Sequence, residues 1–122
     1  MRNTAVDVME RRLYDALKKL PYVKSINFSI LNDETLSANA VLTKLYFIDF
    51  YYNKRMFKLN FALIYRENDN KGKRIWALDR DNRIGWHLHP LNNVGQHEAI
   101  EEKTIEEIVE ISDEVWQKIQ QE

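Results

Sequence analysis

The chain of 122 residues has no cysteine, only three glycines and two prolines, and no long apolar run. Without cysteine it can form neither disulfide bonds nor thiolate metal ligands. No stretch approaches the roughly 20 apolar residues that cross a bilayer, and residues 1–7 lack the apolar core of a signal peptide. We therefore expect a cytoplasmic protein with no membrane contact.

A dominant charge is also lacking, because 18 basic and 19 acidic residues leave a net charge of −1. So weak a field does not by itself imply binding to nucleic acid. The charge is nevertheless uneven: residues 71–83 are mainly basic, whereas residues 98–122 carry nine acidic and two basic side chains. Ordinary solvated surface is the alternative interpretation of both regions.

What the chain has is apolar and aromatic residues, at 44% hydrophobic content with five Phe, six Tyr and three Trp. That content allows a packed core without disulfides or metal, and the length corresponds to one domain. No repeat or linker interrupts the chain. We therefore expect a single domain over residues 1–122.

Two segments have the apolar spacing of amphipathic helices. The first covers residues 4–20, with Thr4 as its cap and Pro21 after its end. The second begins near Thr104, where Thr104 and Glu107 have the spacing of a capping box. Between them, alternating residues predict strands at 22–31, 36–52, 56–65 and 74–79, with polar turns at 32–35 and 53–55 and a polar connection at 67–73. The predicted fold is α+β: an antiparallel meander of about four strands with N- and C-terminal helices on one face, and an irregular histidine segment between sheet and second helix.

The strongest candidate site is residues 79–97, because all three histidines lie at its end: His87, His89 and His97. In extended backbone His87 and His89 project from one face, and imidazoles supply both a general acid and a general base near neutral pH. A carboxylate from Asp79 or Asp81 would orient one ring, and we assign this role to Asp81, which Gly85 allows to approach His87.

The neighbouring basic residues complete a set suited to a phosphodiester. Arg80 and Arg83 would hold phosphate oxygens, and we place Lys73, Arg74 and Asn82 in the same substrate-binding group. Two histidines and an arginine can cleave RNA through its 2′-hydroxyl. Simple packing of the histidines is the alternative. A His-x-His pair can also bind a metal ion, and a metal-dependent enzyme is a further alternative. The chain has no Cys and no His-Glu-x-x-His motif, so we expect no metal and no cofactor.

The run Arg80-Asp81-Asn82, followed by Gly85, His87 and His89-Pro90 and then by a capped acidic helix, resembles the small TumE-type toxins of prokaryotic toxin–antitoxin operons. The resemblance implies the toxin of a type II system, encoded beside a DNA-binding antitoxin. It implies growth arrest through action on RNA or on translation. Together with the residues above, this predicts metal-independent RNA cleavage, as an endoribonuclease, or a block of translation. RNA would be the substrate and the antitoxin the protein partner; a homodimer is left open.

A non-catalytic protein-interaction module is the alternative function. In that case the acidic helix and the sheet bind a partner, and the histidine segment is only a structured loop. For either function we expect Ile108, Ile111, Val115 and Trp116 to pack on the sheet. The acidic outer face of the helix would then repel RNA and attract a basic partner.

Overall fold

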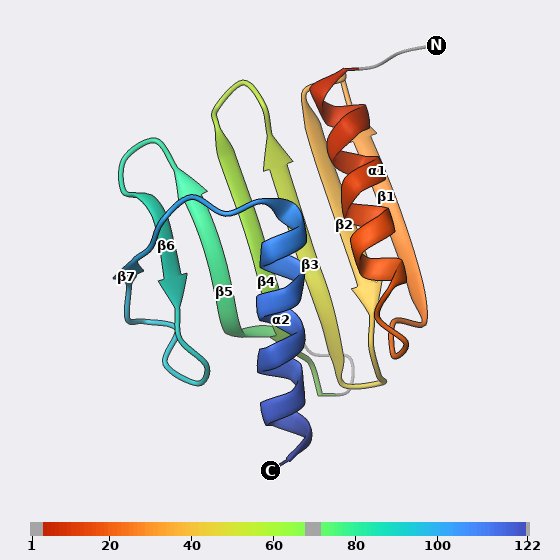
Figure 1. Ribbon diagram of the computed structural model, residues 1–122, viewed down its shortest axis with the longest axis vertical. Coiled ribbons are helices and arrows are strands. Elements are labelled where there is room, and N and C mark those ends of the chain that lie inside the picture. Colours follow the sequence, from red (N-terminus) through yellow and green to blue (C-terminus); the bar gives the residue numbers. More distant parts are fainter. Residues whose placement is uncertain (1–3, 68–71, 122) are drawn as a thin grey trace.

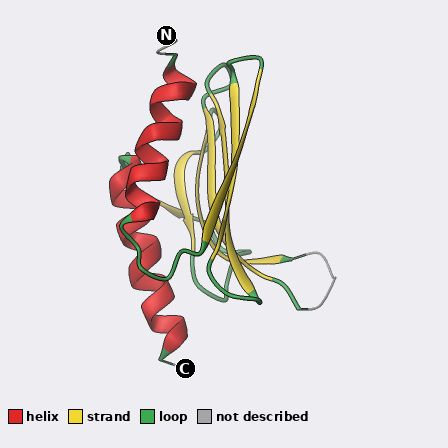
Figure 2. Ribbon diagram, turned by 90° about the vertical axis from the view of Figure 1, so that its right-hand side faces the viewer, coloured by secondary structure: helices red, strands yellow, loops and turns green. Residues whose placement is uncertain are grey.

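The computed structural model describes residues 4–67 and 72–121, which form one antiparallel sheet and two helices. The seven strands lie in the sheet in chain order, β1 to β7. Both helices cover the same face, and no helix formed by these described residues lies on the other face (Figures 1 and 2). The elements are α1 (Ala5–Lys18), β1 (Ser25–Leu31), β2 (Thr35–Val41), β3 (Tyr46–Asn53), β4 (Lys58–Tyr65), β5 (Lys73–Asp81), β6 (Gly85–His89), β7 (Glu98–Ala99) and α2 (Ile105–Gln120).

Both helices begin with the caps that the sequence predicts. The Thr4 and Thr104 hydroxyls accept from the third backbone amide of their helices, and the carboxylates of Asp7 and Glu107 accept from the cap amides in return. Such caps satisfy backbone donors that have no partner within the helix. Among the described residues, neither helix is long and apolar enough to span a membrane.

The core lies between the helices and the sheet. Phe50, Phe61 and Leu78 are fully enclosed there, and α2 packs Ile108 and Trp116 against them, as its spacing predicts. Polar contacts add to this packing: Tyr22 donates to Asp113 of α2 at 2.7 Å, and Arg12 of α1 pairs with Glu106 of α2. Burial and the Asp113 carboxylate raise the pKa of the Tyr22 hydroxyl above its ordinary value.

The α+β class is confirmed, but the expectation of about four strands is too low. The predicted strand at 36–52 is two strands, because the chain turns at residues 42–45, where the Thr43 hydroxyl accepts from the amides of Leu45 and Tyr46 at 3.1 and 3.2 Å. The segment at 85–89 is not irregular, since it pairs with β5 as β6. Most of the predicted polar connection at 67–73 lies outside the described residues.

The meander places three hairpin turns at one end of the sheet, between β1 and β2, β3 and β4, and β5 and β6 (Figure 1). Each contains a residue in the left-handed region. Asn32 and Asp33 occupy it in the first turn and Gly85, with φ of 79°, closes the third; these residue types tolerate that conformation. In the second turn the left-handed residue is Phe57, with φ of 53°.

Candidate functional site

Strands β5 and β6 present different side chains to the two faces of the sheet. Asp79 is paired with His87, and the next residues, Arg80 and Trp86, are paired with each other. Because adjacent residues on a strand point to opposite faces, Asp79 and His87 lie on the open face. Arg80 and Trp86 lie on the face that the helices cover. The segment singled out in the sequence therefore contributes to two separate places.

The three histidines meet on the open face and form the histidine cluster, His87, His89 and His97. The ring centres of His87 and His89 are 5.0 Å apart, and His97 lies 5.4 and 4.4 Å from them. His87 and His89 are only 4% and 7% exposed, whereas His97 is exposed. The prediction that His87 and His89 share one face is confirmed, but the pair does not lie open to a large substrate.

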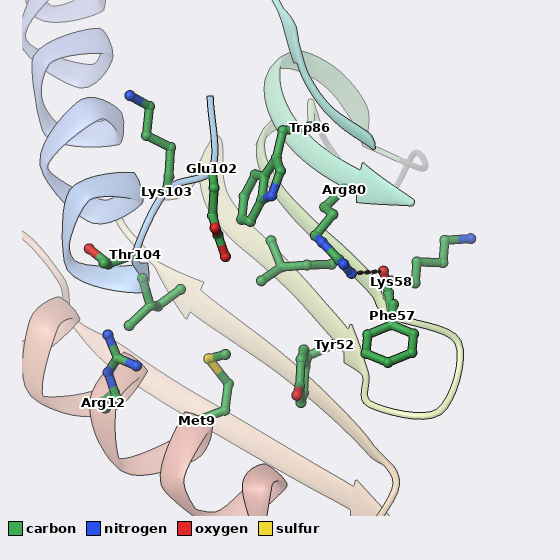
Figure 3. A pocket seen from close by; sticks show the side chains of 12 residues that line it. Met9, Arg12, Tyr52, Phe57, Lys58, Arg80, Trp86, Glu102, Lys103 and Thr104 are labelled. Atoms are coloured by element: carbon green, nitrogen blue, oxygen red, sulfur yellow. Dashed lines mark hydrogen bonds between the residues drawn. The ribbon is translucent and has the colours of Figure 1, made fainter. Parts of the chain in front are cut away.

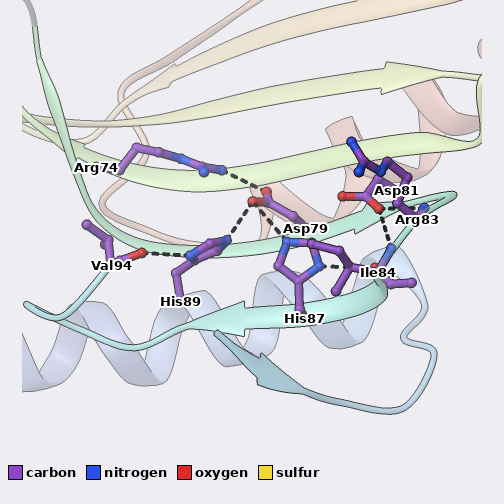
Figure 4. A network of polar contacts seen from close by, with 9 residues as sticks. Arg74, Asp79, Asp81, Arg83, Ile84, His87, His89 and Val94 are labelled. Atoms are coloured by element: carbon purple, nitrogen blue, oxygen red, sulfur yellow. Dashed lines mark hydrogen bonds and ion pairs between the residues drawn. The ribbon is translucent and has the colours of Figure 1, made fainter. Parts of the chain in front are cut away.

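Asp79 is the carboxylate that contacts the histidines (Figure 4). Its Oδ2 atom lies 3.1 Å from His89 Nε2 and 3.8 Å from His87 Nε2. Its Oδ1 atom accepts from Arg74 at 2.7 Å. A buried carboxylate needs such partners, since an unpaired charge in the interior is very costly. Of the cations expected to hold substrate, Arg74 is the one that reaches this group.

Asp81 has another role than the one expected of it. Its Oδ1 atom accepts from the backbone amides of Ile84 and Arg83 at 2.7 and 2.9 Å, which closes the β5–β6 turn. These amides hold the pKa of Asp81 below its ordinary value, Ile84 contributing most. The carboxylate in contact with the imidazoles is therefore that of Asp79, the alternative that the spacing also allowed.

The other predicted phosphate ligands do not converge on the histidines. Arg80 donates to the backbone oxygen of Phe57, and Asn82 donates to the backbone oxygen of Met56 at 2.9 Å. These contacts join the end of β5 and the β5–β6 turn to the neighbouring β3–β4 turn. Arg83 is exposed in the β5–β6 turn. Lys73 is exposed at the first residue of β5.

Arg80 instead helps to line a cleft between the sheet, α1 and the start of α2 (Figure 3). This aromatic cleft has a volume of about 590 Å³. Met9, Leu59 and Ile105 give it apolar walls, and Lys58 and Lys103 extend outward from its rim (Figure 3). The full lining is Met9, Arg12, Tyr52, Phe57, Lys58, Leu59, Arg80, Trp86, Glu102, Lys103, Thr104 and Ile105.

Phe57 is the most unusual residue of the cleft. Its side chain is 58% exposed, its backbone is left-handed, and the Arg80 guanidinium lies 5.3 Å from its ring centre. The sequence predicts a strand from Met56, but the strand begins at Lys58, so Phe57 is a turn residue. The signal that points to it is a short hairpin turn without glycine at residues 53–57.

Comparisons with family models, with curated proteins and with solved structures gave no match to this chain. The fold is therefore described by its architecture alone, an antiparallel seven-stranded meander with two helices on one face. Its candidate sites are the histidine cluster on the open face and the aromatic cleft on the other.

Proposed function

We propose that this chain binds single-stranded RNA in the aromatic cleft and, as the toxin of a toxin–antitoxin pair, blocks translation by doing so. The observation that carries the proposal is Phe57, an exposed aromatic ring held in a left-handed turn under the guanidinium of Arg80. The toxin role and the choice of RNA rest on the resemblance of residues 80–90 to TumE-type toxins.

The backbone at Phe57 is costly for a residue with a side chain. A left-handed conformation costs about 1–2 kcal/mol outside glycine, and a phenyl side chain, unlike that of Asn or Asp, cannot offset this cost with a hydrogen bond of its own. Strain of this kind collects at binding sites, where it holds a side chain in position. The turn thus places an aromatic ring where stability alone would favour glycine or asparagine.

The side chains around Phe57 match the chemistry of an unpaired nucleotide. Tyr52 and Trp86 add two further aromatic rings to the cleft, and Lys58 and Arg80 add positive charge near Phe57. Proteins recognise single-stranded RNA by stacking its bases on aromatic rings or arginine and by holding its backbone with cations. The acidic exterior of α2, with Glu110 and Glu114 exposed, is left for a basic antitoxin surface.

Burial of the histidines favours binding over cleavage. An acid–base pair must touch the scissile phosphate, but His87 and His89 are buried and lie on the face opposite the aromatic cleft. RNA held beside Phe57 would therefore not meet them. The mechanism follows as a block: a bound RNA segment is withheld from the ribosome without being cut.

The decisive experiment compares Phe57→Gly with Met56→Ala in binding a short, unstructured fluorescent RNA. Glycine accepts the turn but removes the ring, so affinity should fall about tenfold, given that base stacking contributes about 1–3 kcal/mol. Met56 is the matched control, because it is equally exposed but does not line the cleft. Equal affinity of Phe57→Gly and wild type would overturn the proposal.

Growth and translation assays then test the toxin role. Expression of wild type in a bacterial host should arrest growth, and purified protein should inhibit translation in an extract while the RNA stays intact. Phe57→Gly should do neither. Shortened RNA in the wild-type reaction that stays whole with His87→Ala would instead establish cleavage.

A further inference from the structure

The histidine cluster has the donors of a transition-metal site. One nitrogen from each of His87, His89 and His97 lies within 4.8 Å of the others. Two of these residues come from β6, and His97 lies between β6 and β7 in the chain. The side chains therefore converge from two segments, a property that the His-x-His spacing alone does not supply.

Hydrogen bonds fix which nitrogens of the buried pair are available. His87 Nδ1 lies 3.1 Å from the carbonyl oxygen of Gly85, and His89 Nδ1 lies 2.8 Å from that of Val94. A carbonyl oxygen only accepts, so both Nδ1 atoms carry hydrogen and donate. This is the usual support of a metal-binding histidine, which ligates through its other nitrogen. Both Nε2 atoms are thereby turned toward the same space.

Asp79 lies across that space (Figure 4). Its Oδ2 atom is 3.1 Å from His89 Nε2 and 3.8 Å from His87 Nε2. A carboxylate oxygen and an unprotonated imidazole nitrogen are both acceptors, so a contact this close needs a proton or a metal ion between them. Arg74 occupies Oδ1 at 2.7 Å and leaves Oδ2 directed at the histidines.

We propose that His87, His89 and His97 bind one divalent transition-metal ion of the zinc class, with the Asp79 carboxylate beside the two buried imidazoles. Ligand atoms around tetrahedral zinc lie about 3.3 Å apart at the usual bond lengths, so the three imidazole nitrogens, which lie within 4.8 Å of one another, would reach that spacing by small side-chain rotations. His97 supplies the third imidazole, and its ring is exposed to solvent.

The donor set also defines the ion. Imidazole nitrogen suits Zn²⁺, Co²⁺, Ni²⁺ and Cu²⁺, whereas Mg²⁺ and Ca²⁺ prefer oxygen ligands. An ion held in this way would fasten the connection after β6 to the open face of the sheet. Asn92 lies within this connection, and its backbone amide already donates to the backbone oxygen of Ile75 in β5 at 2.8 Å. This inference does not depend on the proposed RNA binding, because Asp79 and the cleft residue Arg80 lie on opposite faces.

The test is competition for Zn²⁺ between a chromophoric chelator and full-length protein that has been freed of metal by dialysis. Wild type should take up one equivalent, and Mg²⁺ should not displace it. His97→Ala should weaken Zn²⁺ binding at least about tenfold, while Gln96→Ala, an exposed neighbour, should match wild type. Because His97 is exposed, its substitution should leave the fold intact, which circular dichroism verifies.

Two further readings locate the ion. Zn²⁺ should raise the Tm of wild type and of Gln96→Ala but not that of His97→Ala, since a ligand that binds only the folded state stabilises it. Co²⁺ should give the intense visible absorption of a tetrahedral site when it is added to wild type but not when it is added to His97→Ala. No uptake by wild type, or equal affinity in His97→Ala, would overturn the proposed site, and RNA binding would remain a separate question.

Discussion

The two faces of β5 and β6 are both largely closed to solvent, but by different means. On the helix-covered face Leu78 is enclosed by apolar neighbours. On the open face Asp79, His87 and His89 are almost as buried, yet their partners are polar: Asp79 forms an ion pair with Arg74, and both histidines form hydrogen bonds with backbone carbonyls. Apolar packing accepts many side chains of similar size, whereas a buried polar group depends on particular partners. The open face should therefore tolerate fewer substitutions than the helix-covered face.

The largest expected effect comes from replacing Asp79 with leucine, which has a similar size. Arg74 and His89 would each lose their contact with the carboxylate, and a hydrogen bond to a charged group contributes about 1.5–3 kcal/mol. Leu78→Met, on the other face, should cost under about 1.5 kcal/mol. Urea denaturation followed by circular dichroism measures both. A smaller loss for Asp79→Leu than for Leu78→Met would break the comparison.

Arg74→Gln should have the next largest effect, lowering the free energy of unfolding by about 2 kcal/mol. The Asp79 carboxylate would lose its charged hydrogen bond, and an unsatisfied buried group costs about 1–3 kcal/mol. Lys73→Gln, one residue earlier and exposed, should change stability by less than about 0.5 kcal/mol. Equal effects of the two substitutions in the same urea titration would show that the Arg74–Asp79 contact carries no stability.

Much of this fold follows from the sequence, because its signals are local. The caps Thr4 and Thr104 predict where the helices begin, and the alternation of apolar and polar residues predicts most strands. The turn at residues 42–45 carries no glycine or proline signal, because Thr43 makes it through its hydroxyl. Pro90 and Gly85 suggested an irregular segment, whereas pairing with β5 makes residues 85–89 a strand.

The sites were less predictable, since they depend on contacts between distant residues. Extended backbone predicts that His87 and His89 share a face, but the arrival of His97 depends on the path of residues 90–96. The choice of Asp79 over Asp81 depends on where the β5–β6 turn begins. The role of Phe57 is not predictable from the sequence, because an aromatic residue in a left-handed turn contradicts local backbone preference.

A smaller effect on stability is expected from the left-handed backbone at Phe57, beside the aromatic cleft. Phe57→Gly and Phe57→Ala both remove the ring, so their difference isolates the backbone. Glycine should be the more stable by about 1 kcal/mol, because alanine still resists the left-handed conformation. At Lys54, which is not left-handed, alanine should match or exceed glycine. Thermal denaturation of the four variants measures this, and a more stable alanine at position 57 would refute the strain.

The smallest effect concerns the ion pair that joins the helices. The Arg12 hydrogen bond holds the pKa of Glu106 below its ordinary value of 4.5. A lowered pKa means that the pair stabilises the fold above that value and loses its contribution as the pH falls through the lowered pKa. Both side chains are exposed, so Arg12→Gln should cost only about 0.5 kcal/mol at neutral pH. Near pH 3 the cost should shrink, and a constant cost at both pH values would exclude this pair as its source.

The central claim is that the two faces carry independent sites, and RNA affinity across three proteins tests it most directly. Anisotropy titrations of one labelled single-stranded RNA would compare wild type, Phe57→Gly and His97→Ala in the same buffer. The account predicts about a tenfold loss for Phe57→Gly and an unchanged affinity for His97→Ala. Loss of RNA binding in His97→Ala with full binding in Phe57→Gly would contradict it and return the function to the histidines.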